Sequence, residues 1–251
     1  VAGVTGNDRE LPTEVWVDDG YSAEGGNDGH TWGTDAFSLI QAGIDGVAPG
    51  GTVYVAAGTY TENVIANKTV NILGAGAATT TLYPATSEPG GDDGPSFSGS
   101  QILVVQAHDV EIAGLSLDGD NPALTSGVVR NGADVDARNG IIEGDGPWDY
   151  LHVHDCTIRN IYLRALYARS GGSGFYFHQN TLDNVTGGYA SIAIFGWMAS
   201  GVIEANNVSR ANDAISANHS RGIQFLNNHI SQSSSGIHTD NNGSSGGVAD
   251  V

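Results

Sequence analysis

The chain contains 251 residues, and its 9 Lys and Arg against 28 Asp and Glu give a formal net charge of −19 at pH 7. A surface this acidic disfavours nucleic acids and anionic membranes as partners, and no apolar run approaches the length of a membrane-spanning helix. The 39% hydrophobic content is enough for a packed core, which excludes wholesale disorder. The single cysteine, Cys156, excludes an internal disulfide and a cysteine-based zinc site.

The first 50 residues predict an N-terminal extension that ends in a short capping helix. Apolar residues at helical spacing follow Thr34 and Asp35, and Thr34 is the expected N-cap. A helix in this position covers the open end of a solenoid. The apolar residues are Phe37, Ile40, Ile44 and Val47.

The second half of the chain contains repeats, which decide the predicted fold. Four similar segments begin at Val153, Phe177, Ile203 and Phe225, at intervals of 24, 26 and 22 residues. Each is followed by a second short strand, and no helix is expected between them. This pattern is typical of a solenoid whose coils bury their apolar faces against one another. We therefore predict an all-β fold, a right-handed parallel β-helix.

One column of the repeat supports this architecture. Cys156, Asn180, Asn206 and Asn228 occupy the same position in successive coils, where stacked amides satisfy one another inside the solenoid. We expect a single domain over residues 1–251, with β-helix coils in 51–242 and a linker or cut end in 243–251. Because the chain starts without Met and has no second cap, we expect it to belong to a longer multidomain protein.

The segment Gly51–Val64, with the sequence GTVYVAAGTYTENV, resembles the opening of pectin-lyase-like β-helix proteins. The Gly- and Asn-rich coils from about Val110 onward resemble their parallel β-helix repeats. The resemblance implies an extracellular carbohydrate-binding or sugar-hydrolase type of protein, and its family also includes periplasmic copper-handling proteins. The catalytic motifs of pectate lyases, polygalacturonases, alginate epimerases and pectin methylesterases are not matched.

Two outward-facing columns contain the candidate catalytic residues. His154, His178 and Glu204 share one coil position, and His152 and Tyr176 stand two residues earlier on the same face. Imidazoles beside a carboxylate suit acid–base catalysis or a transition metal. The alternative is a solvated polar face without chemistry.

A second outward face suits a sugar. Its first column contains Tyr167, Phe195 and His238, and its next column contains Arg169, Trp197, Asn218 and Asp240. Exposed aromatic rings stack on sugars, and the polar members bind hydroxyls or carboxylates. Arg169 is counted with the catalytic residues and Tyr176 with the substrate-binding residues. The alternative is that a loop covers these rings or that they pack across the coils.

The acidic loops are the candidate calcium sites, with Asp118, Asp120, Asp134 and Asp136 as ligands. Structural Ca²⁺ is the first cofactor expectation and a transition metal the second. A halophilic surface, on which short carboxylates stay hydrated in high salt, explains the same composition.

Together these features predict an extracellular or cell-surface domain that engages a polysaccharide or surface glycan, with a polysaccharide lyase or glycoside hydrolase as the first hypothesis. The second is a non-catalytic adhesion or carbohydrate-binding module stabilised by salt or calcium. The third is a metal-handling β-helix. Whether the protein is an enzyme is left open.

Overall fold

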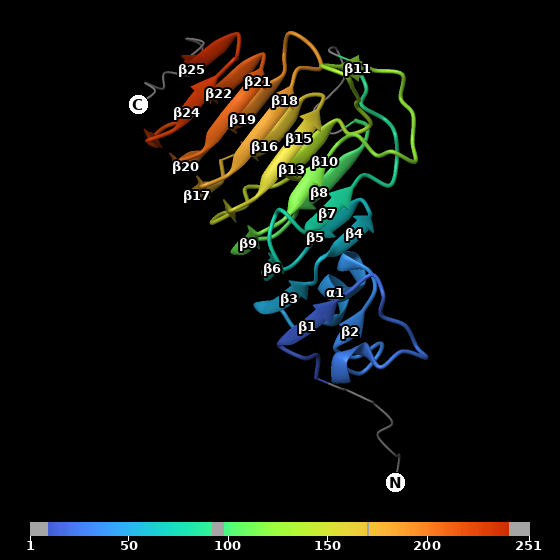
Figure 1. The fold of residues 1–251 in the computed structure, drawn as a ribbon. Coiled ribbons are helices and arrows are strands. Elements are labelled where there is room, and N and C mark those ends of the chain that lie inside the picture. Colours follow the sequence, from blue (N-terminus) through green and yellow to red (C-terminus); the bar gives the residue numbers. More distant parts are fainter. Residues whose placement is uncertain (1–9, 92–97, 170, 241–251) are drawn as a thin grey trace.

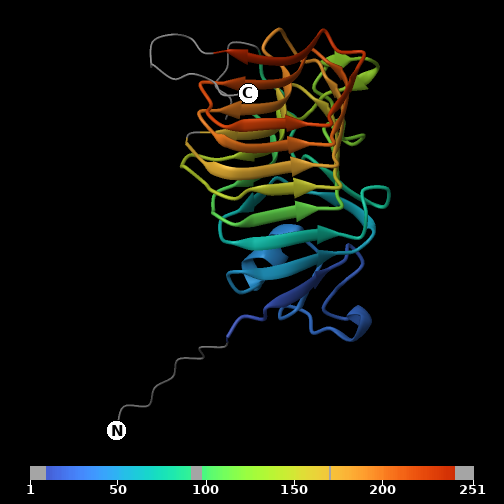
Figure 2. The same ribbon diagram turned by 90° about the vertical axis from the view of Figure 1, so that its left-hand side faces the viewer.

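The computed structural model describes residues 10–91, 98–169 and 171–240, and it is a parallel β-helix (Figure 1). Each complete coil contributes one strand to each of three parallel sheets, here called A, B and C, as in β14, β15 and β16. The strands of successive coils stack with the same direction along the solenoid (Figure 2). The predicted fold class is confirmed.

Sheet A has nine strands and begins with the first strands of the chain, β1 and β2. In spatial order they are β2 (Ala36–Phe37), β1 (Glu14–Val17), β3 (Gly51–Val55), β6 (Val70–Gly74), β9 (Val110–Ala113), β14 (His152–His154), β17 (Ser173–His178), β20 (Ser200–Glu204) and β23 (Ile223–Leu226).

Sheets B and C have seven strands each. Sheet B contains β4 (Gly58–Thr61), β7 (Thr80–Tyr83), β10 (Ser116–Asp118), β15 (Thr157–Ile161), β18 (Thr181–Val185), β21 (Asn207–Ala211) and β24 (His229–Ser231). Sheet C contains β5 (Val64–Ala66), β8 (Gln101–Val105), β13 (Asn139–Glu143), β16 (Arg164–Arg169), β19 (Ile192–Trp197), β22 (Asp213–Asn218) and β25 (Ser235–Asp240). The short antiparallel pair β11 (Val129–Arg130) and β12 (Ala133–Asp134) lies in the insertion between β10 and β13.

The core is built from columns of inward-facing side chains, one per coil. In sheet A the column is in strict register and every member is buried: Val53, Ile72, Ile112, Val153, Phe177 and Ile203. Such stacking removes apolar surface from water only when neighbouring coils are present. The two sides of each strand therefore have separate roles, core inside and surface outside.

The predicted Asn ladder is present at the turn between sheets A and B. The Asn180 and Asn206 side-chain oxygens accept the backbone N–H groups of Cys156 and Asn180 at 3.1 and 3.0 Å. The amide of Asn206 donates to the Phe177 carbonyl at 2.9 Å. Because the amides satisfy buried backbone groups, the chain turns here without an orphaned donor.

The residue before each ladder position has left-handed backbone geometry. Asp155, Gln179, Ala205 and Asn227 have φ between 51° and 56°. This repeated left-handed residue turns the chain out of sheet A in each coil. It also places the side chains of Asp155 and Gln179 beside the last residues of β14 and β17.

The capping helix is shorter than predicted and is capped differently. α1 spans Ile40–Gly46, whereas Thr34 lies before β2 and is not its N-cap. The Glu62 carboxylate caps the helix instead, accepting the Ile40 and Gln41 N–H groups at 2.7 and 3.0 Å. A carboxylate at a helix N-terminus accepts the free backbone N–H groups and is attracted to the positive end of the helix dipole.

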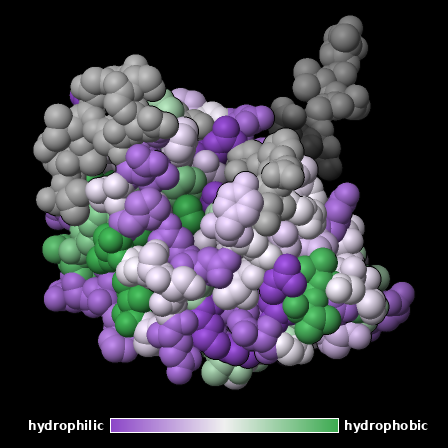
Figure 3. All heavy atoms as spheres, turned by 90° about the horizontal axis from the view of Figure 1, so that it is seen from above, coloured by the Kyte–Doolittle hydropathy of each residue, from purple (hydrophilic) through white to green (hydrophobic). Residues whose placement is uncertain are grey.

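At the β25 end of the solenoid, apolar and hydrophilic side chains are mixed on the surface (Figure 3). Leu226 and Ile237 are 40% and 46% exposed there. The expected linker at 243–251 lies outside the described residues. No helix in the described part of the chain is long and apolar enough to cross a membrane.

Candidate functional site

The outer face of sheet A gathers the predicted histidines into one patch. His154 pairs in register with His178, and His178 pairs with Glu204. In the neighbouring column, two residues earlier on each strand, His152 pairs with Tyr176. We call these five residues, together with Glu111, the histidine patch. Adjacent strands lie about 4.8 Å apart, so side chains from successive coils are in contact range.

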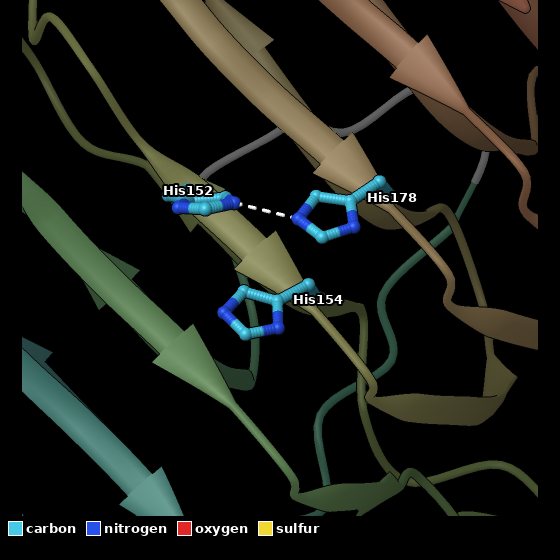
Figure 4. A group of neighbouring side chains, drawn as sticks. All are labelled: His152, His154 and His178. Atoms are coloured by element: carbon cyan, nitrogen blue, oxygen red, sulfur yellow. Dashed lines mark hydrogen bonds between the residues drawn. The ribbon is translucent and has the colours of Figure 1, made fainter.

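The imidazoles contact one another directly (Figure 4). The Nε2 atoms of His152 and His178 are 2.7 Å apart. His154 stacks on His178 with ring centroids 4.8 Å apart and planes 7° from parallel. Ring nitrogens of all three histidines lie within 4.8 Å of one another. In the part of the chain that the structure describes, no other group of His, Cys, Asp or Glu brings three ligand atoms together in this way.

Two carboxylates hold His154 in place. Its Nδ1 lies 2.7 Å from Asp155 Oδ2, and its Nε2 lies 3.0 Å from Glu111 Oε1. Burial lowers the pKa of His154, but its hydrogen bonds to Asp155 and Glu111 outweigh burial, and the pKa is raised overall. For His152, burial and the neighbouring His154 and His178 lower the pKa. The pKa values of two imidazoles on one strand are thus shifted in opposite directions.

Tyr176 and Glu204 form the other polar pair of the patch. The Tyr176 hydroxyl donates to Glu204 Oε2 at 2.5 Å. This hydrogen bond to the carboxylate raises the pKa of Tyr176, which keeps the phenol protonated at neutral pH. The Tyr176 ring also stacks on His178, with centroids 4.1 Å apart. The pair is therefore fixed beside the imidazoles.

Glu111 and Asp155 belong to the site but were not among the predicted site residues. A signal for Glu111 exists in the sequence, since Val110–Gly114 aligns with the first strand of the repeat. Register places Glu111 directly beside His152. Asp155 has no comparable pattern, because its contact depends on the left-handed turn that follows β14.

Arg169 does not join the histidine patch. It ends β16 in sheet C, in register with Trp197. Its guanidinium forms an ion pair with Asp145 at 3.2 Å, and its backbone N–H donates to Glu143 at 2.6 Å. Arg169 therefore lies on the second outward face, as predicted, and its catalytic role stays a prediction.

The outer face of sheet C has the predicted columns, but its central rings are not exposed. Tyr167 and Phe195 are in register, stack at 5.0 Å and are only 6% and 5% exposed. They form a small apolar cluster with Ile142 and Ile192. Cross-coil packing, the alternative considered for this face, accounts for these two rings.

A groove of about 450 Å³ lies beside this cluster, with Trp197 and Asn218 among its lining residues. Arg164 also lines it, with its guanidinium 4.7 Å from the centre of the Phe195 ring. Arg164 is 8% exposed, its Nε has no hydrogen-bond partner among the described residues, and burial lowers its pKa to about 10. No pattern in the sequence indicates a buried cation at this position.

Two outer members of the predicted sugar face, His238 and Asp240, lie on β25. His238 lies 2.6 Å from the carboxylate of Asp213, which is in the same sheet. Asp240 ends β25 in register with Asn218. Tyr176, grouped with the sugar-binding residues, lies on sheet A in the histidine patch, on the face that its column predicts.

The predicted calcium ligands are held by protein donors. Asp118 is paired with Arg159 at 2.8 Å and accepts the Asn160 amide at 2.7 Å. Asp134 accepts from Ser126 at 2.6 Å, and Asp136 accepts from Ser87 at 2.5 Å. Burial, with the Asp118 charge next, raises the pKa of Asp120. Calcium at this loop stays a prediction.

Comparison with known proteins identifies the fold. No family model matches the sequence, and no curated protein matches it. The structure is similar to pectin methylesterase PemA from Erwinia chrysanthemi, with a TM-score of 0.50 and 15% identity, over 86% of this chain and 67% of that one. A pectin methylesterase in complex with a hexasaccharide gives a TM-score of 0.47 and 13% identity, over 84% and 66%. The A-module of mannuronan C-5 epimerase AlgE6 from Azotobacter vinelandii gives 0.36 and 17%, over 77% and 72%.

The likeness to PemA shows the fold alone, because the two sequences are only 15% identical. The chain spans about two thirds of the length of the pectin methylesterases. The protein has the right-handed parallel β-helix fold of pectin-lyase-like proteins, as its opening segment predicts.

Proposed function

We propose that the protein is an extracellular or cell-surface enzyme that cleaves an acidic polysaccharide by β-elimination on the outer face of sheet A. The observation that carries this proposal is the Tyr176–Glu204 hydrogen bond beside three converging imidazoles. A solved structure with the same fold is a pectin methylesterase, which supports a polysaccharide as the partner.

The placement of carboxylates favours elimination over hydrolysis. Glu111 lies on β9 and Glu204 on β20, which are three strand positions apart in sheet A. At the usual strand spacing this is about 14 Å. Glycoside hydrolysis uses two carboxyl groups about 5 to 9.5 Å apart. The two outward-facing glutamates of the patch are therefore too far apart to flank one glycosidic bond.

In the elimination, Glu204 removes the proton from the carbon next to the uronate carboxylate. The C–H electron pair forms the new C=C bond, and the bond to the glycosidic oxygen at the adjacent carbon breaks. Tyr176 donates its proton to that leaving oxygen, so no charge is left on it. The proton on Glu204 then returns to Tyr176 along their hydrogen bond, which restores both groups.

The histidines serve the substrate carboxylate. A chain with a net charge of −19 repels a polyuronate, so the carboxylate needs a local positive group. His152, His154 and His178 gather on the face that holds Tyr176 and Glu204. Neutralising the carboxylate also stabilises the negative charge that develops when the proton is removed.

The test is the release of unsaturated product from uronate polysaccharides by Tyr176→Phe and Glu204→Gln. Each substitution removes one proton-transfer group, and we expect the rate to fall by about 100-fold or more. Melting temperatures are expected to stay near that of the parent protein, because both side chains lie on the surface face. Tyr189→Phe is the matched control, since Tyr189 is 80% exposed and lies outside the patch.

The proposal is overturned if the parent protein releases no unsaturated product from a broad panel of uronate polysaccharides, assayed with and without Ca²⁺ and Zn²⁺. It is also overturned if both patch variants keep the parent rate.

A non-catalytic function is the second candidate, favoured by the groove on sheet C. Trp197 and Asn218 offer a ring face and an amide, and Arg164 lacks a partner for its Nε. Such a groove suits an acidic sugar that is bound and not cleaved. Here Arg164→Gln is expected to weaken glycan binding about tenfold, measured by calorimetry with uronate oligosaccharides, whereas Tyr176→Phe leaves binding unchanged.

A further inference from the structure

The histidine patch has the composition and geometry of a metal site. His152 and His154 lie on β14, His178 lies on β17, and Glu111 lies on the preceding strand β9. The four side chains thus come from three neighbouring strands of one sheet. A sheet fixes their Cβ positions without a loop, which lowers the reorganisation needed to bind an ion.

The distances are near those that an ion requires. Zinc binds imidazole nitrogen at about 2.0 to 2.1 Å, so nitrogens of a tetrahedral site lie about 3.3 Å apart. The observed separations are 2.7 Å between His152 Nε2 and His178 Nε2, and at most 4.8 Å among the three rings. Glu111 Oε1 is 3.0 Å from His154 Nε2. The three ring nitrogens thus form the centre of the site, and Glu111 adjoins it through its contact with His154.

Neighbouring side chains prepare the rings for this role. The Nδ1 atom of His154 lies 2.7 Å from the Asp155 carboxylate, and that of His178 lies 2.9 Å from the Gln179 side-chain oxygen. A proton on Nδ1 satisfies each contact and leaves Nε2 to bind an ion. Metal-binding histidines generally donate their other ring N–H to a carboxylate or carbonyl in this way. Because Asp155 and Gln179 occupy equivalent left-handed turn positions, the coil repeat itself builds this support.

The ligand type selects the class of ion. Three imidazoles and one carboxylate suit Zn²⁺, Cu²⁺ or Ni²⁺, whereas Ca²⁺ and Mg²⁺ prefer oxygen ligands throughout. The patch therefore differs in chemistry from the Asp-rich loop around Asp118, whose carboxylates are held by Arg159 and other donors.

We propose that the outer face of sheet A binds one divalent transition-metal ion through His152, His154 and His178, with Glu111 as the fourth ligand. Binding itself does not depend on catalysis. That the ion receives the carboxylate of a uronate rests on the proposed function, where its charge would add to that of the histidines.

The test is calorimetric titration of the full chain with Zn²⁺ after removal of metals with EDTA. We expect one equivalent to bind and the melting temperature to rise with added Zn²⁺, since an ion that binds the folded state stabilises it. His154→Ala and His178→Gln should weaken binding at least 100-fold, and Asp155→Asn about tenfold. Cobalt(II) should give the visible absorption of a tetrahedral site in the parent protein, and this absorption should be absent from His154→Ala and His178→Gln.

His229→Ala is the matched control, because His229 is an exposed histidine on β24 of sheet B. It should bind Zn²⁺ like the parent. An equal concentration of Ca²⁺ should not displace the ion, which separates the patch from general attraction to acidic groups. Circular dichroism identifies any variant that fails to fold, and Glu111→Gln then provides a further ligand variant, expected to weaken binding.

The inference is overturned if the titration is flat, or if His154→Ala, His178→Gln and Glu111→Gln all bind Zn²⁺ as the parent does. A chain that binds Zn²⁺ at the patch but cleaves no polysaccharide keeps the metal site and refutes the elimination, so the two proposals fail separately.

Discussion

The outer faces of sheets A and C are built by the same coils, yet one is polar and the other is largely closed. On sheet A, β14, β17 and β20 present imidazoles, a phenol and a carboxylate that bond to one another across the strands. On sheet C, β16 and β19 present Tyr167 and Phe195, which pack together and are almost fully buried. An outward position in a solenoid is thus not the same as an exposed one. Whether the side chains of successive coils pack on one another decides if a column is a ligand surface or a second core.

The largest expected effect comes from a carboxyl group hidden at the end of β13 in sheet C. Burial raises the pKa of Glu143 to about 8, against an ordinary value of 4.5. The folded state therefore favours the protonated form, and the stability linked to this group is lost as pH rises from about 4.5 through about 8. At 1.36 kcal/mol per pKa unit this amounts to on the order of 5 kcal/mol.

Glu143→Gln should remove that dependence. The difference in unfolding free energy between variant and parent, measured by urea denaturation at pH 5, 6.5 and 8, should shift in favour of the variant as pH rises. Glu24→Gln is the control, because Glu24 is exposed, and it should show no such trend. Parallel pH profiles for Glu143→Gln and the parent would mean that the Glu143 carboxyl is ionised in the folded state.

The next effect separates the two faces by stability. Phe195→Ala leaves a cavity between Tyr167 and Ile192 and should lower the unfolding free energy by about 3 kcal/mol. Tyr176→Phe removes one hydroxyl on sheet A and should lower it by less than about 1 kcal/mol. Urea denaturation measures both. Equal losses would show that the aromatic cluster on sheet C contributes no more packing than the surface of sheet A.

The smallest effect concerns sheet B, whose outer face carries ion pairs. Arg210 Nε donates to Asp183 at 2.8 Å, and the Arg210 side chain is 41% exposed. Arg210→Ala should lower stability by about 0.5 kcal/mol, and less in high salt. Thermal melts at low and high salt measure this loss of stability, with Asp183→Asn for comparison. A loss well above about 1 kcal/mol would show that the Arg210–Asp183 pair contributes more than an ordinary surface ion pair.

The repeat made the fold and the histidine column predictable. The repeated strand–turn motif places His154, His178 and Glu204 in register although the coils differ in length, and the Asn ladder follows from the same motif. Contacts from outside the repeat were not predictable. Glu62 replaces Thr34 as the helix cap because the coil after α1 carries its carboxylate to the helix end. Arg169 lies on the predicted second face, but its ion pair with Asp145 depends on a loop outside the repeat.

The sequence by itself determined the parallel β-helix, its inward columns and the outward column of His154, His178 and Glu204, because these depend on the repeated motif alone. The tertiary structure decided that Glu111 and Asp155 hold His154 and that Tyr167 and Phe195 are covered. It also decided that Arg164 lines a groove and that the carboxylates of Asp118 and Asp136 already have donors. These features depend on insertions of irregular length and on turns. Their final position is set by packing against coils far away in the chain.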